Sequence, residues 1–319
     1  MKQMERFLIH TGNRILQVGF CLVLVFSMSA CQSNGGGEND SSDMADSTLA
    51  QTSDAASPLE KYEKAKQEYT ENPNDPDALI WYGRRAAYLG NYEEAIDIYS
   101  TGIERHPQDA RMYRHRGHRY ISTRQYDKAI ADFEKAVTLI EGREDRVEPD
   151  GLPNSRNIPL TTLHGNIWYH LGLAYYLKND MDNALRAFSN RAVTERYDDN
   201  IVSGGHWLYM ILSRQGKTEE AKAAISRVTA DMDIIENGSY HQMCLFYKGL
   251  IPESDLEIDD PKSSSANVLS YGLGNWYLYQ KQDTARAKRY YQELLENGNE
   301  YSFAYLAAES DWERIWGEE

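Results

Sequence analysis

Cysteine is scarce in this sequence, and the three that occur are Cys21, Cys31 and Cys244. They are too few and too far apart to form a disulfide framework or a zinc site. Basic residues are also outnumbered, because 34 lysines and arginines face 49 aspartates and glutamates, for a net charge of −15. This excess of acid disfavours a general nucleic-acid binder, which needs a basic surface to displace counterions from phosphates. It equally disfavours electrostatic adsorption to anionic lipid.

Long hydrophobic runs are missing as well. The main apolar run, from Ile15 to Phe26, is short of the roughly 20 residues that a transmembrane helix needs. Basic residues before it and small residues after it are typical of a secretory signal. The segment from Met28 to Cys31 resembles the lipobox of bacterial lipoproteins, in which the cysteine is lipidated and becomes the new N-terminus. We therefore expect a lipoprotein signal peptide over residues 1–30 and lipidation of Cys31, with ordinary cleavage after Ala30 as the alternative.

The segment after this cysteine, residues 31–58, is predicted to be a disordered acidic tether. Residues 32–58 hold five acids and no basic residue, and so polar a segment cannot bury enough surface to offset its ordering entropy. A Gly-rich acidic stretch at this place resembles the export signals of surface lipoproteins in Bacteroidota-type bacteria. Gln32 also replaces the Asp that marks inner-membrane retention in enteric lipoproteins. We expect an exported protein anchored by lipid to the outer membrane, with the periplasmic or surface face left open.

One motif occurs twice in residues 76–141, at a spacing of 34 residues. The same offsets separate small and aromatic residues in both copies, which are Gly83, Ala95, Tyr99 and Gly102, then Gly117, Ala129, Phe133 and Ala136. This pattern resembles the tetratricopeptide repeat, in which small residues stand where two helices cross and neighbouring helix pairs bury a shared core. The resemblance implies an all-α fold, a right-handed superhelix (α-solenoid) of helix pairs.

Less regular copies of the motif follow and extend the expected solenoid over residues 59–316. The expected repeats are about 76–109, 110–141, 165–198, 202–235 and 267–300, with an irregular segment at 236–266 and a C-terminal capping helix at 300–316. An insertion at residues 142–161 separates the second repeat from the third, and Pro149, Pro153 and Pro159 within it predict a loop. Such a long loop either folds over the groove of the solenoid or lies slack.

The sharpest candidate site is the arginine-rich segment 110–122. Arg111, Arg114 and His118 recur at helical spacing and form a stripe beside the packing residues. The resemblance implies that the first helices of the repeats line a concave groove, and some family members clamp the acidic C-terminus of a partner there. Arginine suits this role because its planar fork pairs with carboxylate or phosphate. The predicted groove residues are Arg84, Tyr88, Arg111, Arg114, His118, Tyr169 and Tyr176.

An internal role for these arginines is the competing interpretation. They could pair with acids of neighbouring helices, of which the candidates are Glu93, Glu94, Asp127 and Asp132. His115 and His118 have a spacing that suits a metal, but the flanking arginines would repel a cation. Cys244 lacks a visible base, so a structural role is expected for it. We therefore predict no catalytic residue, no metal and no cofactor.

The expected function is that of a membrane-anchored scaffold or adaptor of the bacterial cell envelope. Its groove would bind a protein partner or an anionic peptide, its N-terminal lipid would bind the membrane, and nucleic acid is not an expected partner. The first alternative is a glycan-binding component of an outer-membrane nutrient-uptake system, which would expose Trp and Tyr pairs on one face. The second is an enzyme with a site near the 142–161 loop, using Glu144, Glu148 or Asp150. The partner and the oligomeric state are left open by the sequence.

Lipidation can be tested by metabolic labelling with palmitate. We expect the wild-type chain to incorporate the label and the Cys31→Ala variant to lose it, because the acyl chains require this thiol. A Cys31→Ala protein that still labels would contradict the prediction.

Overall fold

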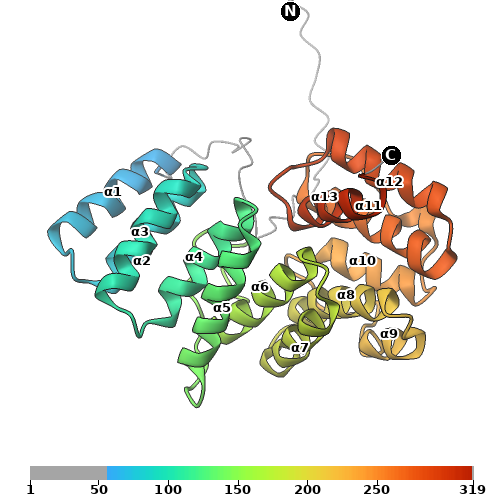
Figure 1. The fold of residues 1–319 in the computed structure, drawn as a ribbon, viewed down its shortest axis with the longest axis horizontal. Coiled ribbons are helices and arrows are strands. Elements are labelled where there is room, and N and C mark those ends of the chain that lie inside the picture. The colour runs from blue at the N-terminus through green and yellow to red at the C-terminus, as the bar shows by residue number, and fades with distance from the viewer. Residues whose placement is uncertain (1–55, 318–319) are drawn as a thin grey trace, which may run out of the picture. The chain divides into compact units, whose positions relative to one another are not determined.

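The computed structural model describes residues 56–317. The predicted signal peptide, Cys31 and most of the predicted tether lie outside the described residues. Within residues 56–317 the regular secondary structure is helical, which confirms the all-α prediction (Figure 1). The backbone also forms an isolated bridge between Val147 and Thr162. None of the helices in this range has both the length and the apolar character needed to cross a membrane.

Within each repeat the two helices are antiparallel neighbours joined by a short turn, and longer segments join α5 to α6, α9 to α10 and α10 to α11 (Figure 1). In chain order they are α1 (Pro58–Glu71), α2 (Pro76–Tyr88), α3 (Tyr92–Arg105), α4 (Ala110–Ser122), α5 (Tyr126–Ile140), α6 (Leu163–Leu177), α7 (Met181–Arg191), α8 (Asp198–Arg214), α9 (Thr218–Ala224), α10 (Gly238–Tyr247), α11 (Ser264–Trp276), α12 (Thr284–Asn297) and α13 (Phe303–Trp316). Short 3-10 turns lie at Ala192–Thr194 and Glu253–Asp255. The helices form the pairs α2/α3, α4/α5, α6/α7, α8/α9 and α11/α12, of which α9 is short and ends eleven residues before the end of the expected repeat 202–235. The irregular segment contributes α10.

Local sequence signals explain where these helices begin and turn. Asp75 and Asp109 cap α2 and α4, each accepting a hydrogen bond from the backbone N–H two residues on, which satisfies a donor that the helix leaves unpaired. The turn after α2 needs a left-handed residue, and Gly90 supplies it with φ +80°. Arg124, one 34-residue period later, takes the same region with φ 60° despite its side chain.

The helix pairs α2/α3, α4/α5 and α6/α7 each cross at a glycine that faces an aromatic ring sixteen residues later. The three facing pairs are Gly83 with Tyr99, Gly117 with Phe133, and Gly172 with Phe188, and a Cβ atom on these glycines would lie 2.6, 2.9 and 2.6 Å from the respective ring. The rings are at most 1% exposed, so they have little freedom to move aside. The helices therefore approach this closely only because the glycines carry no side chain.

The last pair departs from this geometry where the sequence has one residue more in its turn. α11 runs directly into a π-helical turn, Tyr277–Lys281, and Gln282 then adopts the left-handed region with φ 58°. A π-turn widens the helix by one residue per hydrogen-bonded ring. The extra residue is thus absorbed at the end of α11 rather than in a longer loop.

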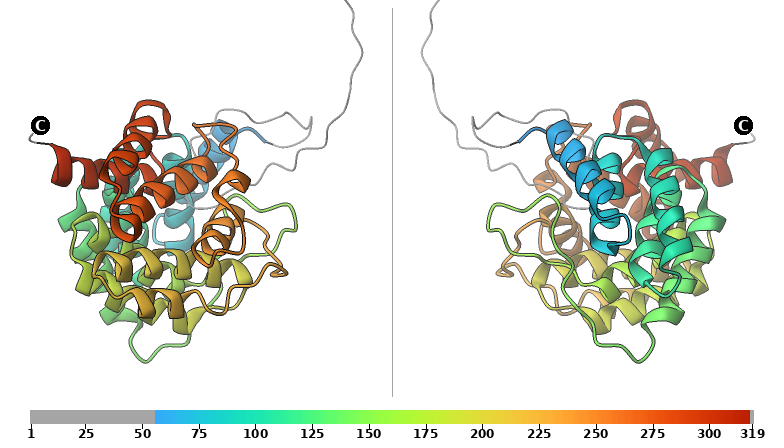
Figure 2. Two further views of the ribbon diagram at one scale, coloured as in Figure 1. Left: turned by 90° about the vertical axis from the view of Figure 1, so that its right-hand side faces the viewer. Right: turned by 90° about the vertical axis from the view of Figure 1, so that its left-hand side faces the viewer.

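The final helix does more than cap the last pair. α13 packs on α11 and α12 and also on α6, and the three C-terminal helices lie together in Figures 1 and 2. At its first residue, the ring of Phe303 lies 5.5 Å from the rings of His118 and His170, which belong to α4 and α6. Further along, Asp311 pairs with the buried Arg214 at the end of α8. The C-terminal helix therefore contacts the second, third and fourth repeats as well as the last.

The Arg214–Asp311 pair is predicted to be essential to this packing. Both side chains are at most 4% exposed, and Asp311 also accepts hydrogen bonds from the hydroxyls of Tyr271 and Tyr291. Asp311→Asn leaves the guanidinium without its counter-charge, so we expect the free energy of unfolding to fall by about 3–5 kcal/mol. Urea unfolding followed by circular dichroism measures this change.

Glu309→Gln is the matched control, because it neutralises a carboxylate on the same helix. Its ion pair with Arg124 is about one third exposed, so the expected loss is about 0–1 kcal/mol. Equal losses of unfolding free energy in Asp311→Asn and Glu309→Gln would contradict the prediction that the Arg214–Asp311 pair is essential to this packing.

Candidate functional site

The 142–161 loop, called the strap below, lies across the face formed by the first helices α2, α4 and α6. Neighbouring members of this set contact each other, α2 with α4 and α4 with α6. The strap is bound by Arg84 of α2, Arg114 of α4 and Asn166 of α6. Of the two courses open to this loop, the structure shows the one in which it folds over the repeats. Figure 2 shows it as the long green segment without helix.

A cationic cavity of about 110 Å³ lies under the strap and is lined by residues of both its halves. Three arginines line it, Arg84, Arg114 and Arg119, together with the hydroxyl-bearing rings of Tyr88, Tyr92 and Tyr99. The carboxylates in its wall, Glu148 and Asp150, both come from the strap. In a chain with a net charge of −15, this is a place where positive charge exceeds negative.

The charged centre of the cavity is the pair formed by Arg114 and Glu148. Arg114 Nη2 lies 2.9 Å from Glu148 Oε2, and the two side chains are 12% and 10% exposed. The same carboxylate accepts a hydrogen bond from Asn166 Nδ2. Burial lowers the pKa of Arg114, while the charge of Glu148 raises it. Glu148 thus stabilises a guanidinium that would otherwise be buried without a counter-charge.

Three histidines of the cavity wall contribute no positive charge near neutral pH. Burial first, and then the nearby arginines, lower the pKa of His115, His118 and His170 well below the usual value. His170 Nδ1 donates to the carbonyl of Asn166 at 2.7 Å, which leaves Nε2 as an acceptor, and this buried atom has no partner. The positive charge of the cavity therefore resides on its arginines alone.

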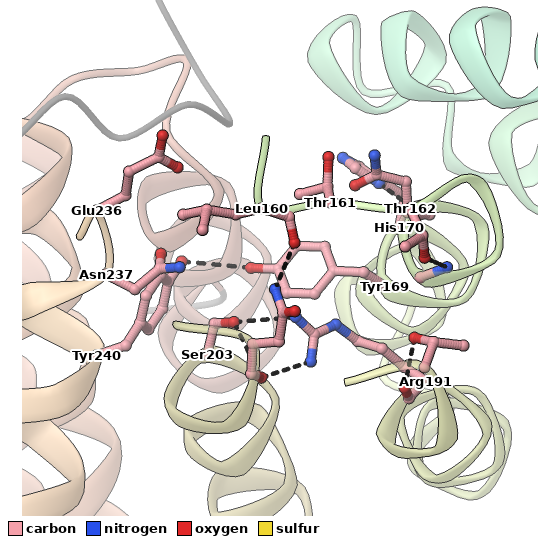
Figure 3. A pocket seen from close by; sticks show the side chains of 14 residues that line it. Leu160, Thr161, Thr162, Tyr169, His170, Arg191, Ser203, Glu236, Asn237 and Tyr240 are labelled. Carbon is pink, nitrogen blue, oxygen red and sulfur yellow. Dashed lines mark hydrogen bonds between the residues drawn. The ribbon is translucent and has the colours of Figure 1, made fainter. Parts of the chain in front are cut away.

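A second, smaller cavity of about 60 Å³ lies beyond the end of the strap, and Figure 3 shows the side chains around it. The two cavities share Leu160, Thr161, Asn166 and His170 as wall residues. Here Arg191 donates to the carbonyl of Asn200 at 2.7 Å and to the hydroxyl of Ser203 at 3.0 Å. The guanidinium carbon of Arg191 also lies 5.1 Å from the centre of the Tyr169 ring. The guanidinium of Arg191 is thus already bonded to other groups of the protein.

The structure separates the predicted groove residues into three groups. Four of them, Arg84, Tyr88, Arg114 and His118, line the cationic cavity. Tyr169 lines the second cavity and accepts a hydrogen bond from the indole of Trp207 at 2.9 Å. The other two, Arg111 and Tyr176, line neither.

Arg111 and Tyr176 are engaged in contacts of other kinds. Arg111 forms ion pairs with Asp109, the residue that caps its own helix, and with Asp77 of the preceding repeat. Tyr176 is 2% exposed, and its hydroxyl lies 2.6 Å from that of Tyr271 in α11. Arg111 therefore links the N-terminal ends of α2 and α4, and Tyr176 belongs to the core.

Of the acids considered as internal partners, Asp132 binds an arginine of the 110–122 segment, and Asp127 and Glu94 bind other groups. Asp132 binds Arg116 through both carboxylate oxygens at 2.8 Å, Asp127 binds Lys178, and Glu94 accepts from the hydroxyls of Tyr62 and Tyr82. Two of the groove arginines pair with other internal acids, Arg111 with Asp109 and Asp77 and Arg114 with Glu148 of the strap.

Arg119, Asn166 and His170 are members of the site that the sequence pattern did not single out. Arg119 falls outside the stripe of Arg111, Arg114 and His118 because it is five residues beyond Arg114. His170 stands within an apolar helix and gives the sequence no signal of its own. Arg119 of α4 lines the same cavity as Asn166 and His170 of α6 because these two helices pack on each other.

Family models confirm the repeat type. Models described as tetratricopeptide repeat match residues 51–110 and 82–144, residues 165–189 and residues 269–297. These matches include the helix pairs α2/α3 and α4/α5 and parts of α6/α7 and α11/α12. No curated protein matches the chain significantly.

Several solved structures are similar in fold at low sequence identity. They include a tetratricopeptide repeat protein from Parabacteroides merdae (16% identity, 79% of this chain and 91% of that chain, TM-score 0.46). YrrB, titled a TPR protein with an unusual peptide-binding site, is 18% identical over 78% of this chain and 98% of its own, with a TM-score of 0.42. A thermophilic TPR protein of Thermus thermophilus is 20% identical over 58% of this chain and 89% of its own, with a TM-score of 0.40. The family models thus detect tetratricopeptide repeats at residues 51–144, 165–189 and 269–297.

Proposed function

We propose that this protein is an exported, lipid-anchored scaffold that binds an acidic segment of a protein partner. The binding surface is the face formed by α2, α4 and α6, at the cationic cavity. The single observation that carries the proposal is the charge of that cavity, where three arginines gather in an acidic chain. A desolvated arginine pairs with carboxylates through short, charge-assisted hydrogen bonds, so an acidic segment is the ligand that the surface favours.

Helix-pair repeats support this role by their architecture. Stacked pairs create a continuous face to which several neighbouring helices each contribute side chains. Here Arg84, Arg114 and Asn166 come from three successive first helices. A ligand that contacts all three has to be extended, as a segment of polypeptide is.

The glycan-binding alternative needs aromatic rings that a sugar can reach. Among residues 56–317 no Trp or Tyr side chain is exposed, and the exposed large apolar residues are Leu59, Val147, Val193 and Leu250. The aromatic residues of this range are instead packed between helices, as in Tyr176 against Trp207 at 5.0 Å. The protein scaffold is therefore the better-supported function.

Membrane anchoring is the second part of the proposal, and the sequence alone supports it. The lipobox at Cys31 would fix the chain to the outer membrane, and the acidic tether would separate the repeats from the bilayer. A partner with an exposed acidic segment in the same envelope compartment could then bind without competition from nucleic acid.

Binding at the cavity can be tested by substituting two of its arginines. We expect the full-length Arg84→Gln/Arg114→Gln variant to lose about tenfold or more of its affinity for an envelope partner, because charged hydrogen bonds contribute about 1.5–3 kcal/mol each. Crosslinking in cells identifies the partner, and titration of the purified pair measures the dissociation constant.

Arg111→Gln is the matched control, since it removes the same charge from the same helix outside the cavity. It should leave the affinity within about twofold, given that Arg111 is neutralised by Asp77 and Asp109. Circular dichroism establishes that each variant keeps its helices. A partner that binds the folded double variant and the wild type equally well would show the proposed surface to be wrong.

A further inference from the structure

The first half of the strap is bound to the repeats as a separate peptide would be. Arg84 Nη1 donates to the carbonyl of Pro149 at 2.8 Å, and Arg85 Nη1 donates to the carbonyl of Gly151 at 3.1 Å. Both contacts go to main-chain atoms, which any extended segment would offer. The contribution of a strap side chain is the carboxylate of Glu148, held by Arg114 and Asn166.

The site also selects against a side chain at one position. A Cβ atom on Gly151 would lie 2.1 Å from the Tyr88 hydroxyl and 2.6 Å from Arg84 Nη2. The Tyr88 hydroxyl is fixed in turn, because Arg84 Nε and Nη2 donate to it at 3.2 and 3.1 Å. Even alanine at this position therefore requires the strap or the Arg84–Tyr88 pair to move.

Polar groups of the cavity remain available after the strap has bound. Arg114 Nε is buried and has no partner. Within residues 56–317 Arg119 forms no ion pair, and its guanidinium lies instead 5.1 Å from the centre of the Tyr92 ring. The cavity of about 110 Å³ adjoins both groups. The strap thus satisfies the site only in part, as a weak ligand does.

The two halves of the strap, residues 142–151 and 152–161, are held by different contacts. The second half is fixed by the buried side chains of Asn154 and Leu160, with Asn154 bonded to Glu236 and the Leu160 carbonyl to Asn200. The first half has the exposed Val147 and Pro149 on either side of the buried Glu148, whose backbone N–H donates to the carbonyl of Thr161 at 3.0 Å. Release of residues 148–151 from the arginines therefore also breaks this hydrogen bond to the second half, and it leaves the contacts of Asn154 and Leu160 in place.

We propose that residues 148–151 of the strap are a copy in cis of the segment that this site binds in trans. The ligand is an extended peptide with an acidic residue, two further residues and then glycine. Arg114 and Asn166 bind the acid, Arg84 and Arg85 bind the next and the fourth carbonyl, and Tyr88 requires the glycine. The partner's segment displaces the strap, so the strap competes with the partner. This inference rests on the proposed function and specifies its ligand.

A fluorescent peptide with the sequence of residues 145–152, DRVEPDGL, is the probe. In the wild type the tethered strap competes at an effective concentration in the millimolar range, so the peptide should bind weakly. The Glu148→Gln/Gly151→Ala variant, called the loosened variant below, weakens the binding of the strap to the repeats in two ways. It should bind the peptide about tenfold or more tightly than the wild type does. Fluorescence anisotropy with the full chain measures both affinities.

Two sets of controls make the result specific. Glu144→Gln removes the same charge from an exposed strap residue and should bind the peptide as the wild type does. On the peptide side, glutamine in place of the glutamate, or alanine in place of the glycine, should each weaken binding to the loosened variant by about tenfold. Should the double variant lose its helices, Gly151→Ala alone, which keeps the Glu148 ion pair, provides the same comparison.

Three results would overturn the inference. One is that the wild type and the loosened variant bind the peptide with equal affinity, whether that affinity is high or low. Another is undiminished binding of the alanine peptide, and the third is displacement of the peptide by inorganic phosphate at an equal concentration, which would make the cavity a small-anion site. Failure here with a partner still dependent on Arg84 and Arg114 would leave the proposed function intact, whereas loss of that dependence would remove both.

Discussion

The close approach of paired helices is the constraint on which the rest of this structure depends. Gly83, Gly117 and Gly172 each bring a first helix within contact of an aromatic ring on the second helix. Because a single Cβ atom would collide with that ring, the distance between the two helices is fixed by the absence of a side chain. Pairs of this compact shape stack so that α2 contacts α4 and α4 contacts α6. Arg84 of α2 and Arg114 of α4 line one cavity as a result.

Two segments of this protein, the strap and α13, cover the face formed by α2, α4 and α6. The strap lies over Arg84 and Arg114, and α13 places Phe303 against the rings of His118 and His170. The two covers differ in chemistry. α13 brings an apolar ring and the deeply buried Asp311, whereas the strap brings main-chain carbonyls and a single buried carboxylate. The first belongs to the stability of the fold, and the second resembles a bound ligand.

Electrostatics explain why the strap runs where it does. Arg114 is almost fully enclosed, and a guanidinium in that position needs a carboxylate close by. No acid of the neighbouring helices binds it, since Asp132 pairs with Arg116 and Asp127 with Lys178. The strap supplies Glu148 instead. A counter-charge held on a long connection can be exchanged for another of the same kind, which a counter-charge on a packed helix cannot.

The sequence by itself determined the helices, their pairing and the chemical type of the site. The 34-residue spacing of small and aromatic residues is a local property, because each helix pair packs mainly on its neighbours, and the arginines of 110–122 are visible in the chain. The tertiary structure alone decided which residues meet. It separated Arg111 and Tyr176 from the cavity, added Arg119, Asn166 and His170, and brought Glu148 from the strap onto Arg114. These outcomes depend on the path of an irregular segment and on the return of α13. Neither leaves a periodic pattern in the sequence, because both are set by contacts between residues far apart in the chain.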